Sequence, residues 1–245
     1  MSKYGTYFIL IMSYLIGGGS LIAFAVFLYI GSFNIMPLGL DKNSALLFNT
    51  VLSVLFFAQH SGMVRRSFRH GMERFIPEEY SSAFYTIVSG IVLLMVLAFW
   101  QRSQGTFASF HGMSRWIFRL MFPASLAGFA WGARSLKSFD PFGIRQIINF
   151  LHGRKPRQVP FTVKGPYRWV RHPLYFFTLL MIWSCPDLTT DRMLFNVLWT
   201  IWIFVGSLLE ERDLVADFGD NYIEYQRRVP MLIPYKLRAW HSDNS

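Results

Sequence analysis

The sequence predicts an all-α, polytopic integral membrane protein, a helical bundle with about six spans. Two observations support this fold class. Hydrophobic residues make up 53% of the 245 residues and charged residues only 16%, whereas a soluble domain has about 25% charged residues. In addition, the apolar residues gather in six segments that are almost free of charge and are separated by polar connections. The mean hydropathy of +0.31 agrees with this reading.

The first four apolar segments form the N-terminal part of the chain, residues 1–133. They are Tyr7–Ile30, Ser44–Ala58, Ala83–Trp100 and Trp116–Ala133. The first is uncharged, long enough to cross a bilayer, and has no small-x-small cleavage site, so we expect a span and not a signal peptide. In the fourth, Gly128 and Gly132 are four residues apart. That spacing predicts close helix packing within the bundle.

The last two apolar segments lie close together in the sequence. Leu174–Cys185 and Met193–Leu209 are joined only by the residues PDLTTDR. Because the first of them is short for a full crossing, we expect the pair to form a tight helical hairpin. The whole chain, 1–245, is then a single membrane domain, with residues 134–172 as a basic loop and residues 173–245 as the hairpin and C-terminal part.

Loop charges predict the orientation in the membrane. The connection after the second segment contains Arg65, Arg66, Arg69 and Arg74, and residues 134–172 contain nine Lys or Arg against one acid. Positively charged loops favour the cytoplasmic side, which places both termini there and puts the C-terminal tail beside the basic loop. Orientation therefore explains the net charge of +10, and we expect no nucleic-acid partner because no recognisable module is present.

The run GPYRWVRHPLY contains the first candidate site residues. Pro173 suits the first turn of a helix, where its missing N–H costs nothing. A helix N-terminus flanked by Arg171 and His172 could bind an anionic or polar ligand group. The same residues could instead form a basic membrane anchor, with Tyr175 in the interfacial aromatic belt.

Glu210 and Glu211 end the last apolar segment, where two acids oppose the helix dipole. If the helix continues, Glu211 lies on an apolar face, and an unpaired carboxylate there would be costly. It needs a cationic partner, for which Arg171 or a ligand amine is a candidate. An ion pair that merely ties the hairpin to the loop is the structural alternative.

Other candidate residues have weaker signals. Tyr222 and Tyr225, three residues apart, could close a pocket by stacking and hydrogen bonding or could anchor the chain at the interface. His60 ends the second apolar segment, and Asp140 and Arg145 begin the basic loop. At such positions a capping or interface role is more common than catalysis. The sequence has no GxGxxG, P-loop, HExxH or CxxC motif, so we expect no metal and no soluble-type nucleotide site. A coupled transporter is disfavoured because no ionisable residue lies deep within a span.

Taken together, GPYRWVRHPLY, the Glu pair and FGDNYIEYQRRVPMLIP resemble the isoprenylcysteine carboxyl methyltransferase superfamily of integral membrane methyltransferases. AQHSGMVRR and SFDPFGIRQ are similar to its bacterial methanethiol S-methyltransferase branch, which implies a bacterial inner membrane. The resemblance implies S-adenosylmethionine bound at the cytoplasmic ends of the last helices. It assigns the cofactor pocket to six residues: His172, Tyr175, Glu210, Glu211, Tyr222 and Tyr225. Phe177 stands where the superfamily often has glycine.

The resemblance further implies methyl transfer to a small thiol, with methanethiol giving dimethyl sulfide. A thiol must ionise before it attacks, and His60, Arg145 or Arg171 is a candidate to deprotonate it or to stabilise the thiolate. Three alternatives remain: a prenylcysteine or lipid acceptor, an NADPH-dependent membrane reductase, and a non-catalytic membrane protein of the denitrification-associated type.

Overall fold

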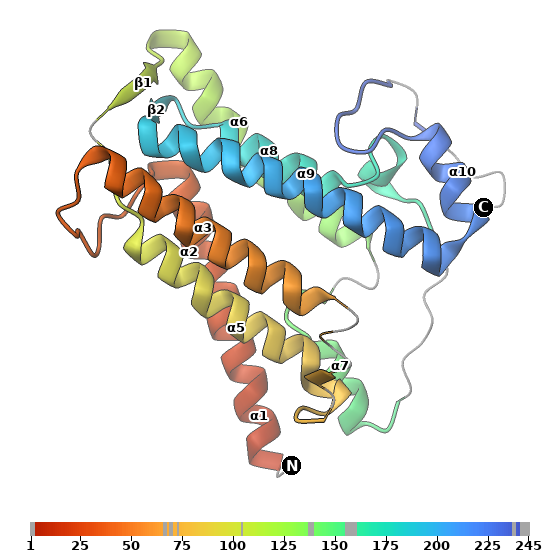
Figure 1. Ribbon diagram of the computed structural model, residues 1–245. Helices are drawn as coiled ribbons and strands as arrows, with labels where there is room; N and C mark the ends of the chain where they lie inside the picture. The colour runs from red at the N-terminus through yellow and green to blue at the C-terminus, as the bar shows by residue number, and fades with distance from the viewer. Residues whose placement is uncertain are drawn as a thin grey trace. The chain divides into compact units, whose positions relative to one another are not determined.

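The computed structural model describes residues 3–65, 68, 71–72, 74–103, 105–136, 140–154, 161–236 and 239–240. Arg66 and Arg69, used above to predict orientation, lie outside these residues. The longer helices are α1 (Lys3–Met12), α2 (Gly18–Ile30), α3 (Lys42–Val64), α5 (Glu78–Phe99), α6 (Gly112–Ser135), α8 (Pro173–Trp183) and α9 (Thr190–Phe218) (Figure 1). The shorter elements are a π-helical turn (Ser13–Gly17), β1 (Thr106–Ser109), α7 (Ile144–Leu151), a 3₁₀ turn (Gly165–Arg168), β2 (Asp187–Thr189) and α10 (Asp220–Arg228).

The regular structure of the described chain is helical, as expected, apart from a two-stranded sheet of β1 and β2. Within the described residues, four helices are long and apolar enough to cross a membrane: Tyr4–Ile30, Lys42–Val64, Glu78–Phe99 and Thr190–Phe218. The helix α6 has 24 residues but carries Arg115 and Arg119 in its first two turns and is not among the four. The helix α8 is apolar but has only 11 residues. The count of six spans and the hairpin stay predictions.

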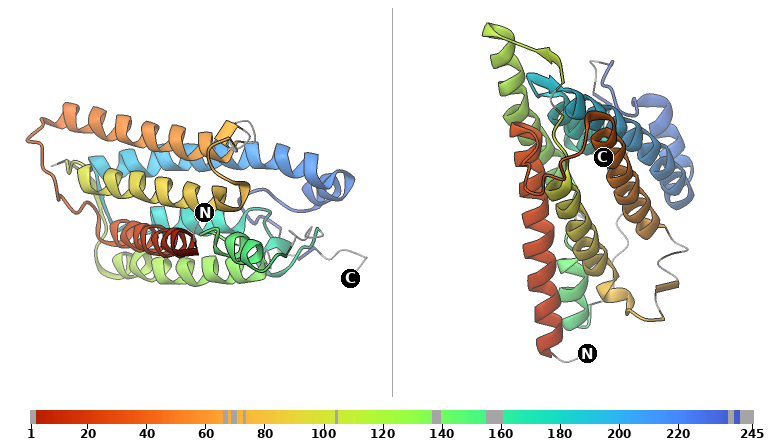
Figure 2. Two further views of the ribbon diagram at one scale, coloured as in Figure 1. Left: turned by 90° about the horizontal axis from the view of Figure 1, so that it is seen from below. Right: turned by 60° about the vertical axis from the view of Figure 1, so that its left-hand side comes forward.

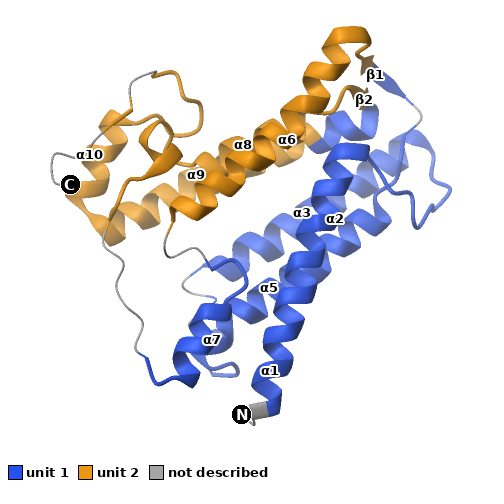
Figure 3. Cartoon of the chain, turned by 180° about the vertical axis from the view of Figure 1, so that it is seen from behind, with its two compact units in different colours: residues 1–107, 140–158, 189–195 blue, residues 108–139, 159–188, 196–245 orange. Residues whose placement is uncertain are grey.

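The chain divides into two compact units (Figure 3). Unit 1 comprises residues 1–107, 140–158 and 189–195, and unit 2 comprises residues 108–139, 159–188 and 196–245. The long helix α9 contributes its first turns to unit 1 and the remainder to unit 2.

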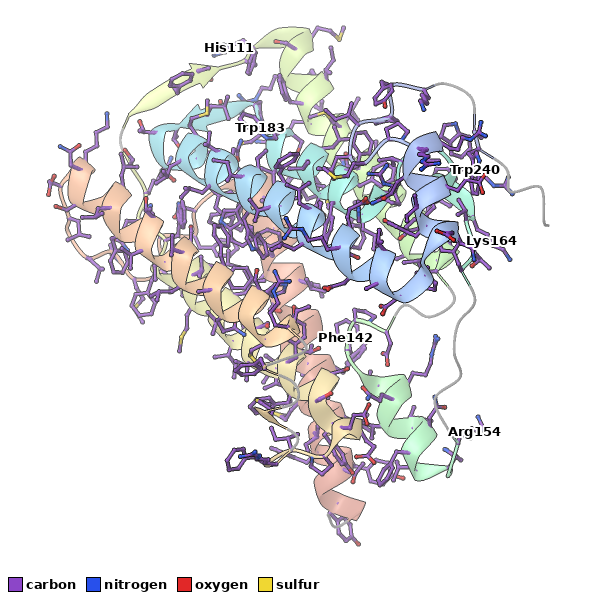
Figure 4. All side chains as sticks on the ribbon, turned by 45° about the vertical axis from the view of Figure 1, so that its right-hand side comes forward. His111, Phe142, Arg154, Lys164, Trp183 and Trp240 are labelled. Carbon is purple, nitrogen blue, oxygen red and sulfur yellow. The ribbon has the colours of Figure 1, made fainter. Side chains whose placement is uncertain are left out.

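In unit 1, α2 and α3 each pack against α5 (Figure 2). Close approach depends on Gly17, at the end of the π-helical turn. A Cβ atom there would collide with the side chains of Thr86 on α5 and Phe142 before α7. The hydroxyl of Ser13 donates a hydrogen bond of 2.6 Å to the carbonyl of Phe142, which is labelled in Figure 4. Small and polar residues therefore fasten the first helix to its neighbours.

Buried polar residues at the start of α9 hold the opposite end of unit 1. The Arg192 guanidinium donates hydrogen bonds of 3.1 and 2.8 Å to the carbonyls of Phe27 and Leu28 in the last turn of α2. Asp191 accepts a hydrogen bond of 3.2 Å from the indole N–H of Trp100. The arginine thereby supplies donors to carbonyls in the last turn of α2, where partners further along the helix run out. None of these contacts was predicted from the sequence.

The basic loop contains a helix that the sequence analysis did not predict. Asp140 caps α7, because its carboxylate accepts hydrogen bonds of 3.1, 2.8 and 3.3 Å from the first three N–H groups of the helix. Ile147 of α7 is fully buried against Tyr80 and Ala83 of α5. Asp140 thus has the capping role that its position suggested.

In unit 2, α6 and α8 pack closely because of glycine. A Cβ atom on Gly128 would fall on the ring of Phe177, and one on Gly132 would fall on the side chain of Leu174. The predicted packing within the bundle is therefore confirmed. The large residue at position 177 is accommodated by the absence of a side chain on the facing helix.

Two polar contacts join the other elements of unit 2. Trp183 of α8, labelled in Figure 4, donates a hydrogen bond of 3.0 Å from its indole to the hydroxyl of Thr200 on α9. Asp187 of β2 forms an ion pair of 2.7 Å with Arg115 of α6. Hydrogen bonding to this guanidinium, together with a hydrogen bond from Ser109, lowers the pKa of the Asp187 carboxyl below its usual value.

Candidate functional site

The candidate site lies in unit 2, where the end of α9, the start of α8 and α10 meet. Gly219 separates α9 from α10 with a φ of 56°, a conformation that favours glycine. The N–H of Gly219 bonds the carbonyl of Val215, and its own carbonyl accepts from the N–H of Tyr222. The chain therefore reverses at this residue, and α10 directs tyrosine side chains back toward α9.

The centre of the site is Glu211, which is only 6% exposed. Its Oε1 accepts hydrogen bonds from Arg171 Nε at 2.8 Å and His172 Nε2 at 2.6 Å. The same oxygen accepts from the hydroxyl of Tyr222 at 2.8 Å, and Oε2 accepts from the amide of Gln226. A carboxylate offers about four lone-pair sites. Four donors already contact this carboxylate, three at Oε1 and one at Oε2, so little acceptor capacity is left for a ligand.

Arg171 is the cationic partner that the sequence analysis proposed for Glu211. Its NH1 group also donates hydrogen bonds of 2.9 and 2.5 Å to the carbonyls of Gln226, within α10, and Val229, just after its end. The main-chain N–H groups of Arg171 and His172 bond the carbonyls of residues 230–231 at 2.9 and 3.1 Å. The guanidinium and this backbone pairing together fix the start of α8 against the segment that follows α10.

His172 and Glu210 form the side of the site where fewer polar atoms have hydrogen-bond partners. The His172 ring is 5% exposed and stacks on Tyr175, with ring centroids 5.6 Å apart. Because Nε2 donates to Glu211, the imidazole is assigned the Nε2–H tautomer. Its Nδ1 lies 3.8 Å from Glu210 Oε2, which is too long for a hydrogen bond. The Glu210 side chain is 44% exposed, so the two adjacent acids differ sharply in accessibility.

An aromatic cluster forms the wall beside α10. Tyr222 and Tyr225 are each 3% exposed, and Phe161, Phe218 and Trp240 pack against them. Trp240 is labelled in Figure 4. Burial raises the pKa of both tyrosine hydroxyls well above the ordinary value, so they stay protonated and act as hydrogen-bond donors.

The structure brings most of the predicted site residues together, but two of them lie in unit 1. His60, on α3, is half-buried, and its Nε2 is 2.8 Å from the hydroxyl of Tyr85 on α5. Its ring also stands against that of Phe56. Arg145 is exposed in the first turn of α7, where its main-chain N–H bonds Asp140.

Sequence reasoning missed two members of the site. Gln226 lies four residues after Tyr222 on α10, and this helical spacing was a usable signal. The carbonyl of Tyr167 accepts a hydrogen bond of 2.5 Å from Tyr225. A backbone acceptor has no signature in the sequence, because every residue carries the same group.

The arrangement suits a ligand that combines a cationic amine with an apolar or aromatic part. Glu210 is the carboxylate with the more exposed side chain. The His172 ring lies 3.8 Å from this carboxylate and stacks on the Tyr175 ring. The buried Glu211 network keeps these groups in place. Within the described residues, no group of three or more histidine, cysteine or acidic side chains could hold a metal ion.

Comparison with curated proteins finds relatives along most of the chain. A methanethiol S-methyltransferase of a Pseudomonas species is 35% identical over 80% of this chain and 76% of its own length. Methanethiol S-methyltransferase 2 of Bradyrhizobium diazoefficiens is 34% identical over 88% of this chain and 85% of its own. Nurim of Rattus norvegicus is 24% identical over 70% of this chain. No family model and no solved structure matches the chain. Because this chain is 34–35% identical to these bacterial relatives over most of both sequences, it belongs to the methanethiol S-methyltransferase family.

Proposed function

We propose that this protein is a membrane methyltransferase that moves the methyl group of S-adenosylmethionine to methanethiol and forms dimethyl sulfide. The observation that carries the proposal is the identity of 34–35% to proteins named methanethiol S-methyltransferase, over 80–88% of this chain. The chemistry of the site supports it, because an accessible carboxylate beside an aromatic wall suits a ligand that has an amine and an aromatic base.

When bound, S-adenosylmethionine supplies a methyl group activated by its sulfonium. Glu210 would hold the cofactor's ammonium, since its side chain is 44% exposed, whereas Glu211 is buried among four protein donors. Tyr175 and His172 would line the cofactor beside it. The aromatic wall of Tyr222 and Tyr225 would exclude water from this side of the pocket.

Methyl transfer is an in-line displacement, so the protein contributes mainly by holding donor and acceptor in line in a dry pocket. The ion pair between Arg171 and Glu211 would fix the start of α8 for this purpose. His60 and Arg145 are the remaining acceptor-side candidates, as residues that bind or activate the thiol. A methyl-transfer rate of His60→Ala or Arg145→Ala equal to the wild-type rate would remove the corresponding role.

We further propose six spans, with α8 and α9 as the final hairpin and both termini in the cytoplasm of a bacterial inner membrane. The four long apolar helices and the basic residues in the loop between α6 and α8 support this arrangement. A fluorescent reporter that matures only in the cytoplasm, fused after Ser245, should be bright. A dark fusion with normal membrane expression contradicts the orientation.

The experiment that tests the function is headspace analysis of cells that express this chain and are fed methanethiol. The proposal predicts dimethyl sulfide well above the level of cells expressing Glu210→Gln, a variant that keeps the size of the side chain. Dimethyl sulfide at the same level in both cultures contradicts it. S-Adenosylhomocysteine should raise the thermal unfolding midpoint of the purified protein, whereas stabilisation by NADPH alone would favour a reductase.

A further inference from the structure

We propose that His172 is the general base that removes the proton of the thiol acceptor, at its Nδ1 atom. The proposal rests on the proposed function, because it names the residue that prepares the acceptor for methyl transfer. In the roles considered above, His172 only lines the cofactor. There the thiol is deprotonated by His60, or an arginine stabilises the thiolate.

The tautomer of His172 leaves Nδ1 available. Its Nε2 donates a hydrogen bond of 2.6 Å to Glu211 Oε1, and the other three donors to Glu211 favour the ionised carboxylate. A neutral imidazole whose Nε2 carries the hydrogen has its lone pair on Nδ1. In the part of the chain that the structure describes, no hydrogen bond engages Nδ1, and its nearest acid, Glu210, is 3.8 Å away.

The groups around the ring would stabilise the positive charge that His172 gains when it accepts a proton. Glu211 and Glu210 of α9 face the two ring nitrogens at 2.6 and 3.8 Å. The positive charge of Arg171 is paired with Glu211 and bonded to backbone carbonyls. Tyr222 is neutral because burial raises its pKa, and Tyr175 stacks on the ring. A carboxylate that orients a histidine whose other nitrogen takes the proton is the arrangement of a nucleophile-activating dyad.

The step balances in atoms and charge. The thiol S–H bond breaks and its proton moves to Nδ1. The electron pair left on the thiol sulfur forms the bond to the methyl carbon, while the pair of the broken carbon–sulfonium bond stays on the donor sulfur as a thioether. After the products leave and Glu210 is released from the ammonium, His172 passes the proton to Glu210, whose side chain is 44% exposed, and from there to water. Each turnover releases one proton.

The test compares two acceptors that differ in ionisation. Methanethiol must lose a proton, whereas methaneselenol is already ionised at neutral pH and needs no base. We expect His172→Gln, whose amide can still donate to Glu211, to lower the rate with methanethiol about 10²- to 10⁴-fold. The rate with methaneselenol should fall about tenfold or less. His111→Asn, an exposed histidine before α6, is the matched control and should keep wild-type rates with both acceptors.

The outcomes separate the inference from the proposed function. Equal losses with both acceptors in His172→Gln show a positioning or cofactor-binding role and overturn the inference. A selective loss with methanethiol in His60→Ala, and not in His172→Gln, assigns the base to His60 and also overturns it. No methylation of either acceptor by the wild-type protein is a failure of the proposed function itself.

Two measurements on the wild-type protein keep the inference testable if His172→Gln does not fold. On acidification the rate with methanethiol should fall more steeply than the rate with methaneselenol; parallel pH profiles contradict the assignment. In ¹⁵N-histidine NMR spectra of the protein in detergent without cofactor, one of the six histidines should show a strong Nε2–H hydrogen bond and a bare Nδ1 at the assay pH. An imidazolium at that position could not act as a base.

Discussion

Substitutions of the two adjacent acids should have different effects, on stability for the buried Glu211 and on ligand binding for the accessible Glu210. Glu211→Gln removes the charge that is paired with Arg171, whose side chain is only 11% exposed. Removing one partner of a buried ion pair costs about 3–5 kcal/mol. The lower end applies here, because the glutamine oxygen can still accept from His172 and Tyr222 and the guanidinium keeps two carbonyl partners. For a chain of this size, about 3 kcal/mol corresponds to a fall of about 6–12 °C in the unfolding midpoint.

Glu210→Gln is the matched control and should do the opposite. Within the described residues, the ionic contact of its half-exposed side chain is the one of 3.8 Å with His172. The cost to stability should therefore be under about 1 kcal/mol. If Glu210 holds the cofactor's ammonium, losing a hydrogen bond between charged groups, worth about 1.5–3 kcal/mol, should weaken S-adenosylhomocysteine binding about 10- to 150-fold.

The assay pairs thermal unfolding, followed by tryptophan fluorescence in detergent, with calorimetric titration of S-adenosylhomocysteine. The expected pattern is a lower unfolding midpoint for Glu211→Gln and a weaker ligand affinity for Glu210→Gln. The reasoning fails if Glu211→Gln unfolds at the wild-type temperature but no longer binds, while Glu210→Gln binds normally.

Three further outcomes follow from contacts outside the site. Gly128→Ala should cost about 1–3 kcal/mol through a clash with the Phe177 ring, and combining it with Phe177→Ala should cost less than the sum of the two changes. Asn196→Leu should raise the unfolding midpoint, because the buried amide of Asn196 has no partner among the described residues. Because Arg115 lowers the pKa of Asp187 below about 3.9, their ion pair stabilises the fold above that value and is lost as pH falls through the lower, folded-state pKa. The difference in stability between wild type and Asp187→Asn should therefore be under about 1 kcal/mol at pH 6 and vanish in acid.

The fold was predictable from the sequence where apolar segments are long. Each predicted segment matches a helical stretch, but the ends differ. The segments ending at Trp100 and Cys185 run past the ends of α5 and α8. By contrast, Met193–Leu209 lies inside α9, which continues to Phe218. Hydropathy stops at Glu210, whereas the backbone stays helical until glycine breaks it at position 219. The helix α7 was missed because eight residues in a basic loop give too short an apolar pattern, and its stability comes from the Asp140 cap and from burial of Ile147.

The types of side chain in the candidate site were predictable from the sequence, but most contacts between those side chains were not. The cost of burying Glu211 without a partner predicted an ion pair with Arg171, and the structure contains it. The other three donors converge from α8 and α10, and no local pattern predicts contacts between such distant segments. For that reason the sequence left a ligand amine open as the partner of Glu211, whereas the burial of this carboxylate among four protein donors leaves Glu210 as the candidate. Asp191 and Arg192 looked like ordinary loop charges because burial depends on tertiary packing.

The most direct test of the central claim is an isotope-transfer measurement with the purified protein. The protein is incubated with methanethiol and S-adenosylmethionine whose transferable methyl group is deuterated, and the headspace gas is examined by mass spectrometry. The account predicts dimethyl sulfide that carries one deuterated methyl group, in amounts equal to the S-adenosylhomocysteine formed, and almost none from Glu210→Gln. Unlabelled or absent dimethyl sulfide from folded protein that binds S-adenosylhomocysteine would contradict it.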